Sequence, residues 1–462
     1  MGEIMTDLTR LTLAEAGAWL RSGATTSLAL TEAALARVAS LEPKLNAFIT
    51  VTADQALKAA QAADAERAAG RDRGPLHGVP IGIKDLCATE GVRTTAGSKI
   101  LTDWVPDRDA TVVSKLKDAG AVSLGKLNLH EFAYGTHSNN QWYGAVHNPW
   151  NTDCHPGGSS GGSGAAVASG ECFAAIGTDT GGSIRMPAAL CGTVGLMPTS
   201  GLVSRAGVTP LSWSLDHIGP LARTVRDAAL FLNAIAGFDP NDPASARTPA
   251  GFDAAAGIGH SVAGVRIGVP RSQWANCDPD VAAAVDEALR VLASLGAKVT
   301  DIAIPMLDAG FRSTVLSSEA AAFHAQWLRE RPMDYGDEIR PLLLYGLTIP
   351  AYEYVNDLRL RAEFTAEVRE VMRDIDVIAG PTCERVASPI AELADGAYRY
   401  SSLTAPWNHT GQPSMSVPCG FGKGNLPIGL MLTGRPFEEA LLCRVGHAYE
   451  AATAWHAMWP PL

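Results

Sequence analysis

The sequence predicts an α/β fold, and two observations favour it. Helical patterns alternate with short apolar runs, as where the helical residues 111–119 precede the apolar run 121–125. Apolar residues make up 47% and charged residues 18% of the 462 residues, which is typical of a chain that folds around a core. The length alone would allow about three domains. We nevertheless expect one domain, residues 1–462, because the segments that carry chemistry must meet in one site.

The N-terminal segment, residues 1–70, is expected to be helical. The run Thr12-Leu13-Ala14-Glu15 matches a capping box, and Gly23 fits the end of the helix that follows. Two further helical patterns cover residues 27–41 and 54–69, and each is followed by a proline or a glycine.

Residues 74–235 are expected to form the centre of the fold. The apolar run 81–83 predicts a short strand that ends at Lys84. Three glycine clusters follow, at residues 157–164, 181–183 and 192–201. Glycine lets the backbone approach a ligand closely, so these clusters are candidates for a binding loop.

The rest of the chain continues the alternation of helices and strands. We interpret residues 238–262 as a loop inserted into the domain rather than as a linker between domains. Beyond it, strands are expected at 265–269, 298–302, 376–379, 413–418 and 427–433, and helices at 280–294 and 352–373.

Charge and composition argue against several classes of protein. Lys and Arg number 37 against 48 Asp and Glu, a formal charge of −11, and no cluster of basic residues offers a surface for nucleic acid. The start of the chain does not resemble a signal peptide, and no run of 18 apolar residues could cross a membrane. We therefore expect a cytoplasmic protein that binds neither nucleic acid nor membrane.

Metal ligands and cofactor motifs are not expected either. The eight cysteines are spaced singly, with no C-x-x-C pair, and are expected to be reduced thiols. The histidines form neither H-x-x-x-H nor H-E-x-x-H. From these patterns we predict no metal and no cofactor.

Three uses of the glycine clusters can be compared. A phosphate cradle needs G-x-x-x-x-G-K-[ST] or G-x-G-x-x-G, and neither pattern occurs. The run Gly157-Gly158-Ser159-Ser160-Gly161 satisfies G-x-S-x-G, but it follows a polar loop where a nucleophile elbow would follow a strand. The run 178–183 suits an oxyanion hole made of backbone amides with Ser183 at its end, and this use is favoured.

Four runs in this region are typical of one enzyme family. They are Gly82-Ile83-Lys84-Asp85 and the segments 157–163, 177–188 and 191–199. On these motifs the sequence resembles the amidase signature family over nearly its whole length. The resemblance implies an α/β fold with a central, mixed and twisted β-sheet that is covered by helices on both sides.

The resemblance also implies a catalytic triad of Lys84, Ser159 and Ser183. Ser183 matches the family's nucleophile, Ser159 its bridging serine on a cis peptide, and Lys84 its base. The implied oxyanion hole consists of the backbone amides of Thr180, Gly181, Gly182 and Ser183. A linear amide would be cleaved through an acyl-enzyme on Ser183, with Ser159 passing protons between Ser183 and Lys84.

Residue chemistry is consistent with these roles. A serine hydroxyl is a weak nucleophile that needs a base, and lysine can be that base only when burial or a cationic neighbour lowers its pKa. Ile81, Ile83 and Leu86 offer an apolar setting around Lys84, whereas Asp85 would oppose the shift if it pointed inward.

Other residues are expected to support the site or to line a substrate pocket. Ser160, Asp179 and Arg185 are predicted to support the site, and we interpret Asp179 and Arg185 as a charge pair that positions the loop. Candidate pocket residues, for which packing in the core is an equal alternative, are Tyr134, Trp142, Tyr143, Trp213 and Leu342.

The kind of substrate is predicted from one short segment, in which this sequence differs from a member of the family. Within the family, the glutamyl-tRNA amidotransferase A subunit holds the glutamine carboxylate with an arginine pair, but Pro341 and Leu342 stand at the corresponding place, next to Arg340. We therefore expect a stand-alone amidase for small neutral or hydrophobic amides, with esters or carbamates as further candidates. Its only partners would be the small amide and water, and the protein would be a monomer or homodimer.

Two alternatives are kept. One is the glutaminase A subunit itself. The other is a catalytically silent scaffold subunit, which the presence of Lys84, Ser159 and Ser183 disfavours.

Overall fold

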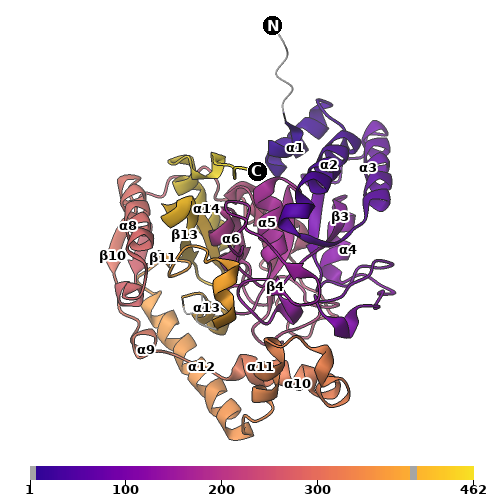
Figure 1. The fold of residues 1–462 in the computed structure, drawn as a ribbon. Coiled ribbons are helices and arrows are strands. Elements are labelled where there is room, and N and C mark those ends of the chain that lie inside the picture. Colours follow the sequence, from indigo (N-terminus) through magenta and orange to yellow (C-terminus); the bar gives the residue numbers. More distant parts are fainter. Residues whose placement is uncertain (1–6, 396–402) are drawn as a thin grey trace.

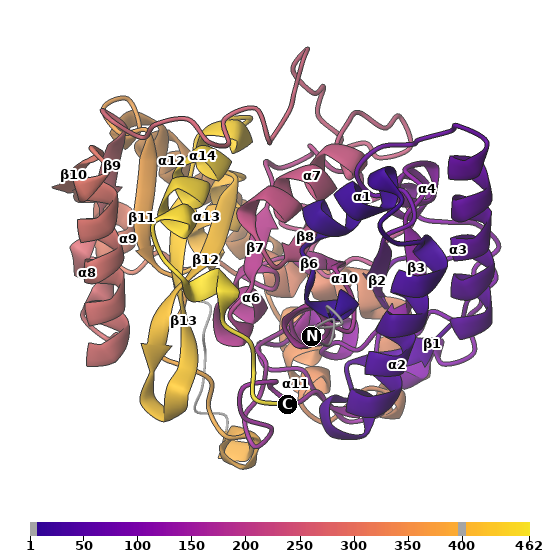
Figure 2. The same cartoon turned by 90° about the horizontal axis from the view of Figure 1, so that it is seen from above.

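An eleven-stranded mixed β-sheet runs through the molecule, and helices cover both of its faces (Figures 1 and 2). The computed structural model describes residues 7–395 and 403–462, so residues 1–6 of the predicted N-terminal helical segment lie outside the described part. The strand order is β1-β3-β2-β6-β8-β7-β12-β13-β11-β9-β10. The predicted α/β class and the mixed sheet between helices are confirmed.

The N-terminal part supplies one edge of the sheet and the helices over it. The predicted capping box is present, with Glu15 N–H donating to Thr12 Oγ1 at 3.1 Å, and Gly23 ends the first helix with a φ of 75°. The elements are α1 (Leu13–Ser22), α2 (Ser27–Leu45), β1 (Phe48–Val51), α3 (Ala53–Ala68), β2 (Pro80–Lys84), α4 (Thr111–Asp118), β3 (Val122–Leu127) and the short pair β4 (Asn139–Asn140) and β5 (Gly144–Ala145).

The glycine-rich centre is almost completely buried. A Cβ atom on Gly162 would lie 2.4 Å from the carbonyl oxygens of Ala47 and Asn128, so only glycine permits this packing. The elements here are α5 (Gly161–Ser169), β6 (Ala174–Asp179), α6 (Arg185–Cys191), β7 (Val194–Met197), β8 (His217–Ala222) and α7 (Val225–Ile235).

The C-terminal half completes the sheet on its other side. Residues 238–262 contain turns but no helix or strand. The elements are β9 (Arg266–Val269), α8 (Pro279–Ser294), β10 (Lys298–Asp301), α9 (Pro305–Asp308), α10 (Val315–Glu330), α11 (Ile339–Gly346), α12 (Ala351–Val371), β11 (Val377–Pro381), α13 (Ala405–Thr410), β12 (Ser414–Gly422), β13 (Leu426–Thr433) and α14 (Glu439–Ala451). None of the helices in the described residues has both the length and the apolar composition that crossing a membrane requires.

Three neighbouring strands position the site. Strand β2 is parallel to both β3 and β6, so their carboxyl ends lie at the same edge of the sheet. Lys84 is the last residue of β2, Asp179 is the last residue of β6, and the chain leaves β3 into the loop 128–138. Side chains from three distant segments therefore meet at this edge.

Candidate active site

Lys84 is fully buried and contacts three hydroxyl groups. Its Nζ lies 2.8 Å from Ser159 Oγ, 2.8 Å from Ser160 Oγ and 2.7 Å from Thr178 Oγ1. Burial lowers the pKa of Lys84 from 10.5 to about 7, against the opposing influence of acidic groups farther away. A neutral amine has two N–H donors and one lone pair, so one of these hydroxyls then donates its hydrogen to Nζ.

Asp85 does not face Lys84. Its carboxylate accepts hydrogen bonds from the amide and the hydroxyl of Thr95, at 2.8 and 2.5 Å, and lies 3.6 Å from Lys126 Nζ. The arrangement in which Asp85 would raise the pKa of Lys84 is therefore not the one observed.

The two serines beside Lys84 lie on a tight, buried loop. The peptide bond between Gly158 and Ser159 is cis. A Cβ atom on Gly158 would lie 2.6 Å from the backbone nitrogen of His137, which explains glycine at this position. Ser160 links the loop to β6, because its hydroxyl donates to the carbonyl of Thr178 at 3.2 Å.

A buried carboxylate organises the loop that carries Ser183. The carboxylate of Asp179 pairs with Arg185 through two hydrogen bonds of 2.9 and 3.0 Å, and it also accepts the amides of Gly182 and Ile184. Burial alone would raise the pKa of Asp179, but Arg185 and the hydrogen bonds, including one from Asn408, lower it well below its usual range. Both side chains are fully buried, so they position the loop and do not line a cavity.

The backbone amides of this loop are not equivalent. The Gly182 N–H donates to Asp179 Oδ1 at 2.7 Å, so it is occupied within the loop. In the described part of the chain, no hydrogen bond engages the amides of Gly181 and Ser183. These two amides are thus available to an oxygen atom at Ser183.

Ser183 lines a cavity of about 760 Å³. Thr180, Gly181 and Ser183 form one wall, and Tyr134 and Leu342 from the predicted pocket set lie on other walls. Among the described lining residues, Glu338 is the only acidic side chain, and neither Lys nor Arg is present.

The other three predicted pocket residues do not line this cavity. Trp142 donates from Nε1 to Glu131 at 3.1 Å, and the Tyr143 hydroxyl contacts Thr102 Oγ1 at 2.9 Å, so both are used in packing. Trp213 is 61% exposed and lines a neighbouring cavity of about 390 Å³, which also contacts Thr180.

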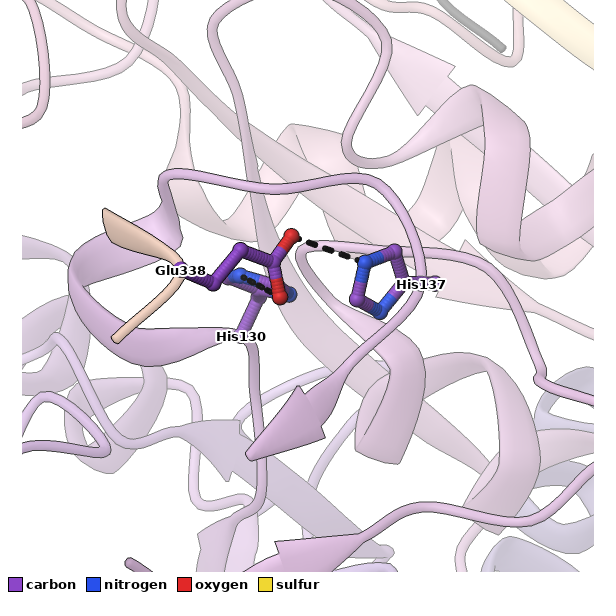
Figure 3. Close-up of side chains that lie close together, drawn as sticks. All are labelled: His130, His137 and Glu338. Atoms are coloured by element: carbon purple, nitrogen blue, oxygen red, sulfur yellow. Dashed lines mark hydrogen bonds and ion pairs between the residues drawn. The ribbon is translucent and has the colours of Figure 1, made fainter. Parts of the chain in front are cut away.

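Two histidines and a glutamate lie together beside the main cavity (Figure 3). His130 and His137 come from the loop after β3, and Glu338 occupies the N-cap position of α11 without a side-chain capping hydrogen bond. His137 Nε2 lies 2.9 Å from one oxygen of Glu338, and His130 Nε2 lies 3.7 Å from the other. No pattern in the sequence indicates this cluster, because the glutamate lies far along the chain from both histidines and the three fit no spaced motif.

Sequence reasoning also missed three residues that hold the site. Thr178 supplies the third hydroxyl to Lys84, Thr404 donates to the Gly181 carbonyl at 2.5 Å, and Asn408 bonds both Asp179 and Arg185. Thr178 lies inside the 177–188 motif and could have been inferred from it. Thr404 and Asn408 lie far from that motif in the sequence, and only the fold brings them near.

Fold and site together define a hydrolase of carbon–nitrogen bonds. The model of the amidase family matches residues 29–443, so the chain belongs to that family and the predicted resemblance is confirmed.

Individual relatives agree with this assignment. The chain is 44% identical to the A subunit of the glutamyl-tRNA(Gln) amidotransferase from Roseiflexus sp. strain RS-1, over 99% of each chain. It superimposes on the crystal structure of the corresponding A subunit from Thermotoga maritima with a TM-score of 0.83 and 35% identity, over 99% of each chain. It also matches, at a TM-score of 0.89 and 36% identity over 96% and 98% of the two chains, a structure described as a vestigial protein complex that reveals the evolutionary origins of an s-triazine catabolic enzyme.

The relatives show that the expected function was wrong. The prediction of a stand-alone amidase for neutral or hydrophobic amides depends on Pro341 and Leu342, which stand where an arginine pair is expected in the amidotransferase A subunit. That inference depended on one short segment, whereas similarity to the amidotransferase A subunits extends over 99% of the chain.

The expected partners were wrong as well. A small amide and water, with no nucleic acid, were expected for a monomer or homodimer, but these relatives are named as subunits of an enzyme that acts on a tRNA. The net charge of −11 describes the surface of this chain alone and carries no information about other subunits.

Proposed function

We propose that this chain is the glutaminase A subunit of a glutamyl-tRNA amidotransferase. It would hydrolyse the side-chain amide of glutamine and release ammonia for transfer to glutamate on tRNA. The observation that supports this most strongly is the 44% identity to a curated A subunit over 99% of both chains. The buried contact between Lys84 and Ser159 supports the enzyme over the silent scaffold.

In this proposal Ser183 attacks the amide carbonyl. Lys84 takes up the proton through Ser159, whose Oγ lies 2.8 Å from Nζ, and a pKa of about 7 leaves much of Lys84 neutral at physiological pH. The amides of Gly181 and Ser183 stabilise the oxyanion, while the Gly182 amide holds the loop to Asp179.

The proton then returns along the same path as ammonia leaves. Lys84 returns the proton through Ser159 to the leaving nitrogen, and ammonia departs from a glutamyl ester on Ser183. Water then attacks the ester and gives a proton to Lys84 by the same route. As the ester bond breaks, Lys84 returns this proton through Ser159 to Ser183 Oγ, which releases glutamate and restores the enzyme.

The cavity offers one charged group to the substrate. Burial raises the pKa of Glu338, but the hydrogen bond from His137 and the nearby His130 and His137 rings together hold it below its usual value, so Glu338 is ionised at neutral pH. We propose that Glu338 binds the α-ammonium group of glutamine and that Leu342 and Leu316 contact its methylene groups.

The wider assembly follows from the same proposal. This chain would supply ammonia and would act together with the other subunits of the enzyme, as the names of its relatives imply. A cytoplasmic location remains a prediction from the sequence.

The test compares substrates and labels the nucleophile. Purified protein, alone and with the subunits that co-purify with it, is assayed for ammonia release from glutamine and from neutral aliphatic and aryl amides. We expect glutamine to be preferred, glutamyl-tRNA to be amidated by the complex, and a fluorophosphonate probe to label Ser183.

The matched variants are Ser183→Ala and Ser22→Ala, which replaces an exposed serine on α1. Only Ser183→Ala should abolish turnover and labelling. Faster hydrolysis of neutral amides than of glutamine, without amidation of glutamyl-tRNA, would overturn the proposal.

A further inference from the structure

We propose that His130, His137 and Glu338 form a binding site for a divalent metal ion of the zinc type on the wall of the active-site cavity. One ligand atom from each of the three residues lies within 4.8 Å of the others (Figure 3). The site differs from the Lys84–Ser159–Ser183 machinery and uses none of its residues.

His130 is the strongest indication of a missing ligand. Its side chain is only 2% exposed, and Nε2, the ring nitrogen that faces the cluster, has only the 3.7 Å approach of Glu338. Buried imidazole nitrogens are normally hydrogen-bonded, because an unsatisfied buried polar atom is destabilising.

The ring of His130 is also fixed in place. It lies against the backbone of Gly135, where an added Cβ atom would come within 2.2 Å of Nε2. The ring of His137 packs edge-on at 4.8 Å between centroids. Two imidazoles are therefore held side by side before any ion binds.

Glu338 provides the adjustable part of the site. Ligand atoms around a tetrahedral zinc lie roughly 3.3 Å apart, given Zn–N and Zn–O distances near 2.0–2.2 Å. The ligand atoms here lie up to 4.8 Å apart, so the most widely separated pair must converge by about 1.5 Å. The Glu338 side chain is 48% exposed, so it can move more readily than either ring.

Metal binding requires one proton shift. His137 Nδ1 accepts the Asn139 amide at 3.3 Å, so the proton of the neutral ring is on Nε2, which faces Glu338. On binding, that proton moves to Nδ1 and the long hydrogen bond to Asn139 is lost. Asn139 is exposed, so water can satisfy its amide.

The donor set selects the class of ion. Two imidazoles and one carboxylate suit Zn²⁺ and related transition ions and are poor ligands for Ca²⁺ or Mg²⁺. Three protein ligands leave a fourth position open. Because His137 and Glu338 line the same cavity as Ser183, that position lies at the substrate cavity.

One consequence depends on the proposed function. If Glu338 binds the α-ammonium of glutamine, metal and substrate compete for the same carboxylate. Zn²⁺ should then raise the KM for glutamine and leave kcat unchanged.

The test of the site is binding, which does not require a substrate. Full-length protein is titrated with Co²⁺, and its visible spectrum shows whether nitrogen and oxygen or sulfur are the ligands. We expect one equivalent to bind without the intense near-ultraviolet band of a cobalt–thiolate bond. Zn²⁺ should displace it.

Three variants make the test specific. Glu338→Gln and His137→Ala should each weaken binding by about tenfold or more, since each removes a ligand, whereas His260→Ala, an exposed histidine elsewhere, should have no effect. Glu338 is half-exposed, so Glu338→Gln keeps the proposal testable if a histidine variant fails to fold. Equal binding by all three variants, a thiolate band, or no binding would overturn the site. Absence of glutamine hydrolysis would leave the binding result intact.

Discussion

Two fully buried lysines lie on neighbouring parallel strands, and their surroundings differ. Lys84 ends β2 and contacts only hydroxyl groups, from Ser159, Ser160 and Thr178. Lys126 on β3 lies 3.6 Å from the carboxylate of Asp85 and also donates to backbone and hydroxyl oxygens of the loop 87–94.

The difference shows that burial alone does not make a base. Burial lowers the pKa of both lysines, but at Lys126 the charge of Asp85 opposes the shift at close range. Among the described residues, no carboxylate contacts Lys84. We infer that the Lys84 region is built for proton transfer and the Lys126 region for holding a loop in place.

The largest expected effect separates the two lysines by activity. Lys84→Met should lower kcat for amide hydrolysis by roughly 10²–10⁴-fold, because a general base contributes that much. Lys126→Met should leave kcat of the folded fraction within a few-fold. Steady-state ammonia release, with the folded fraction measured by circular dichroism and size-exclusion chromatography, checks this. A similar loss of kcat in both variants would show that the two lysines do not differ in their role in catalysis.

The second expected effect is a difference between the two lysines in their contribution to the free energy of unfolding. Lys126→Met should lower the free energy of unfolding by about 3–5 kcal/mol, because Asp85 then stays buried without its cation. Lys84→Met removes a costly buried amine and leaves no carboxylate unpaired, so its stability should change little or rise. Urea denaturation measures both.

The double variant Lys126→Met/Asp85→Asn is the control. It should recover most of the loss, since no buried charge remains unpaired. If it is no more stable than Lys126→Met alone, the ion pair is not the reason for the loss.

The sequence indicates the residues around Lys84 more directly than those around Lys126, and the reason is physical. Lys84, Ser159 and Ser183 each lie in a contiguous motif, because a strand end or a glycine loop must have a particular local sequence. Lys126 pairs with Asp85 only through the alignment of β2 with β3, and no local pattern encodes that contact.

The same reason limits what could be predicted of the cavity. Tyr134 and Leu342 line the cavity, whereas Trp142 and Tyr143 are used in packing, a difference that composition does not reveal. Glu338 reaches the cavity from the start of α11, far beyond Ser183 in the sequence, so only the assembled fold brings it there. Substrate choice inferred from one segment was correspondingly wrong.

The last effect is a dependence on pH, measured relative to Lys84→Met so that the contribution of Lys84 is isolated. Its pKa is about 7 in the folded protein and 10.5 ordinarily, so between these values the unfolded chain binds one more proton. The free energy of unfolding should therefore rise with pH in this window, by at most about 1.4 kcal/mol per pH unit, relative to Lys84→Met. Over the same range kcat/KM should rise and level off above about pH 7, as the neutral base becomes populated. Urea denaturation and initial rates from pH 6 to 10 measure both, and parallel stability curves for wild type and Lys84→Met would show that Lys84 titrates normally and cannot act as the base.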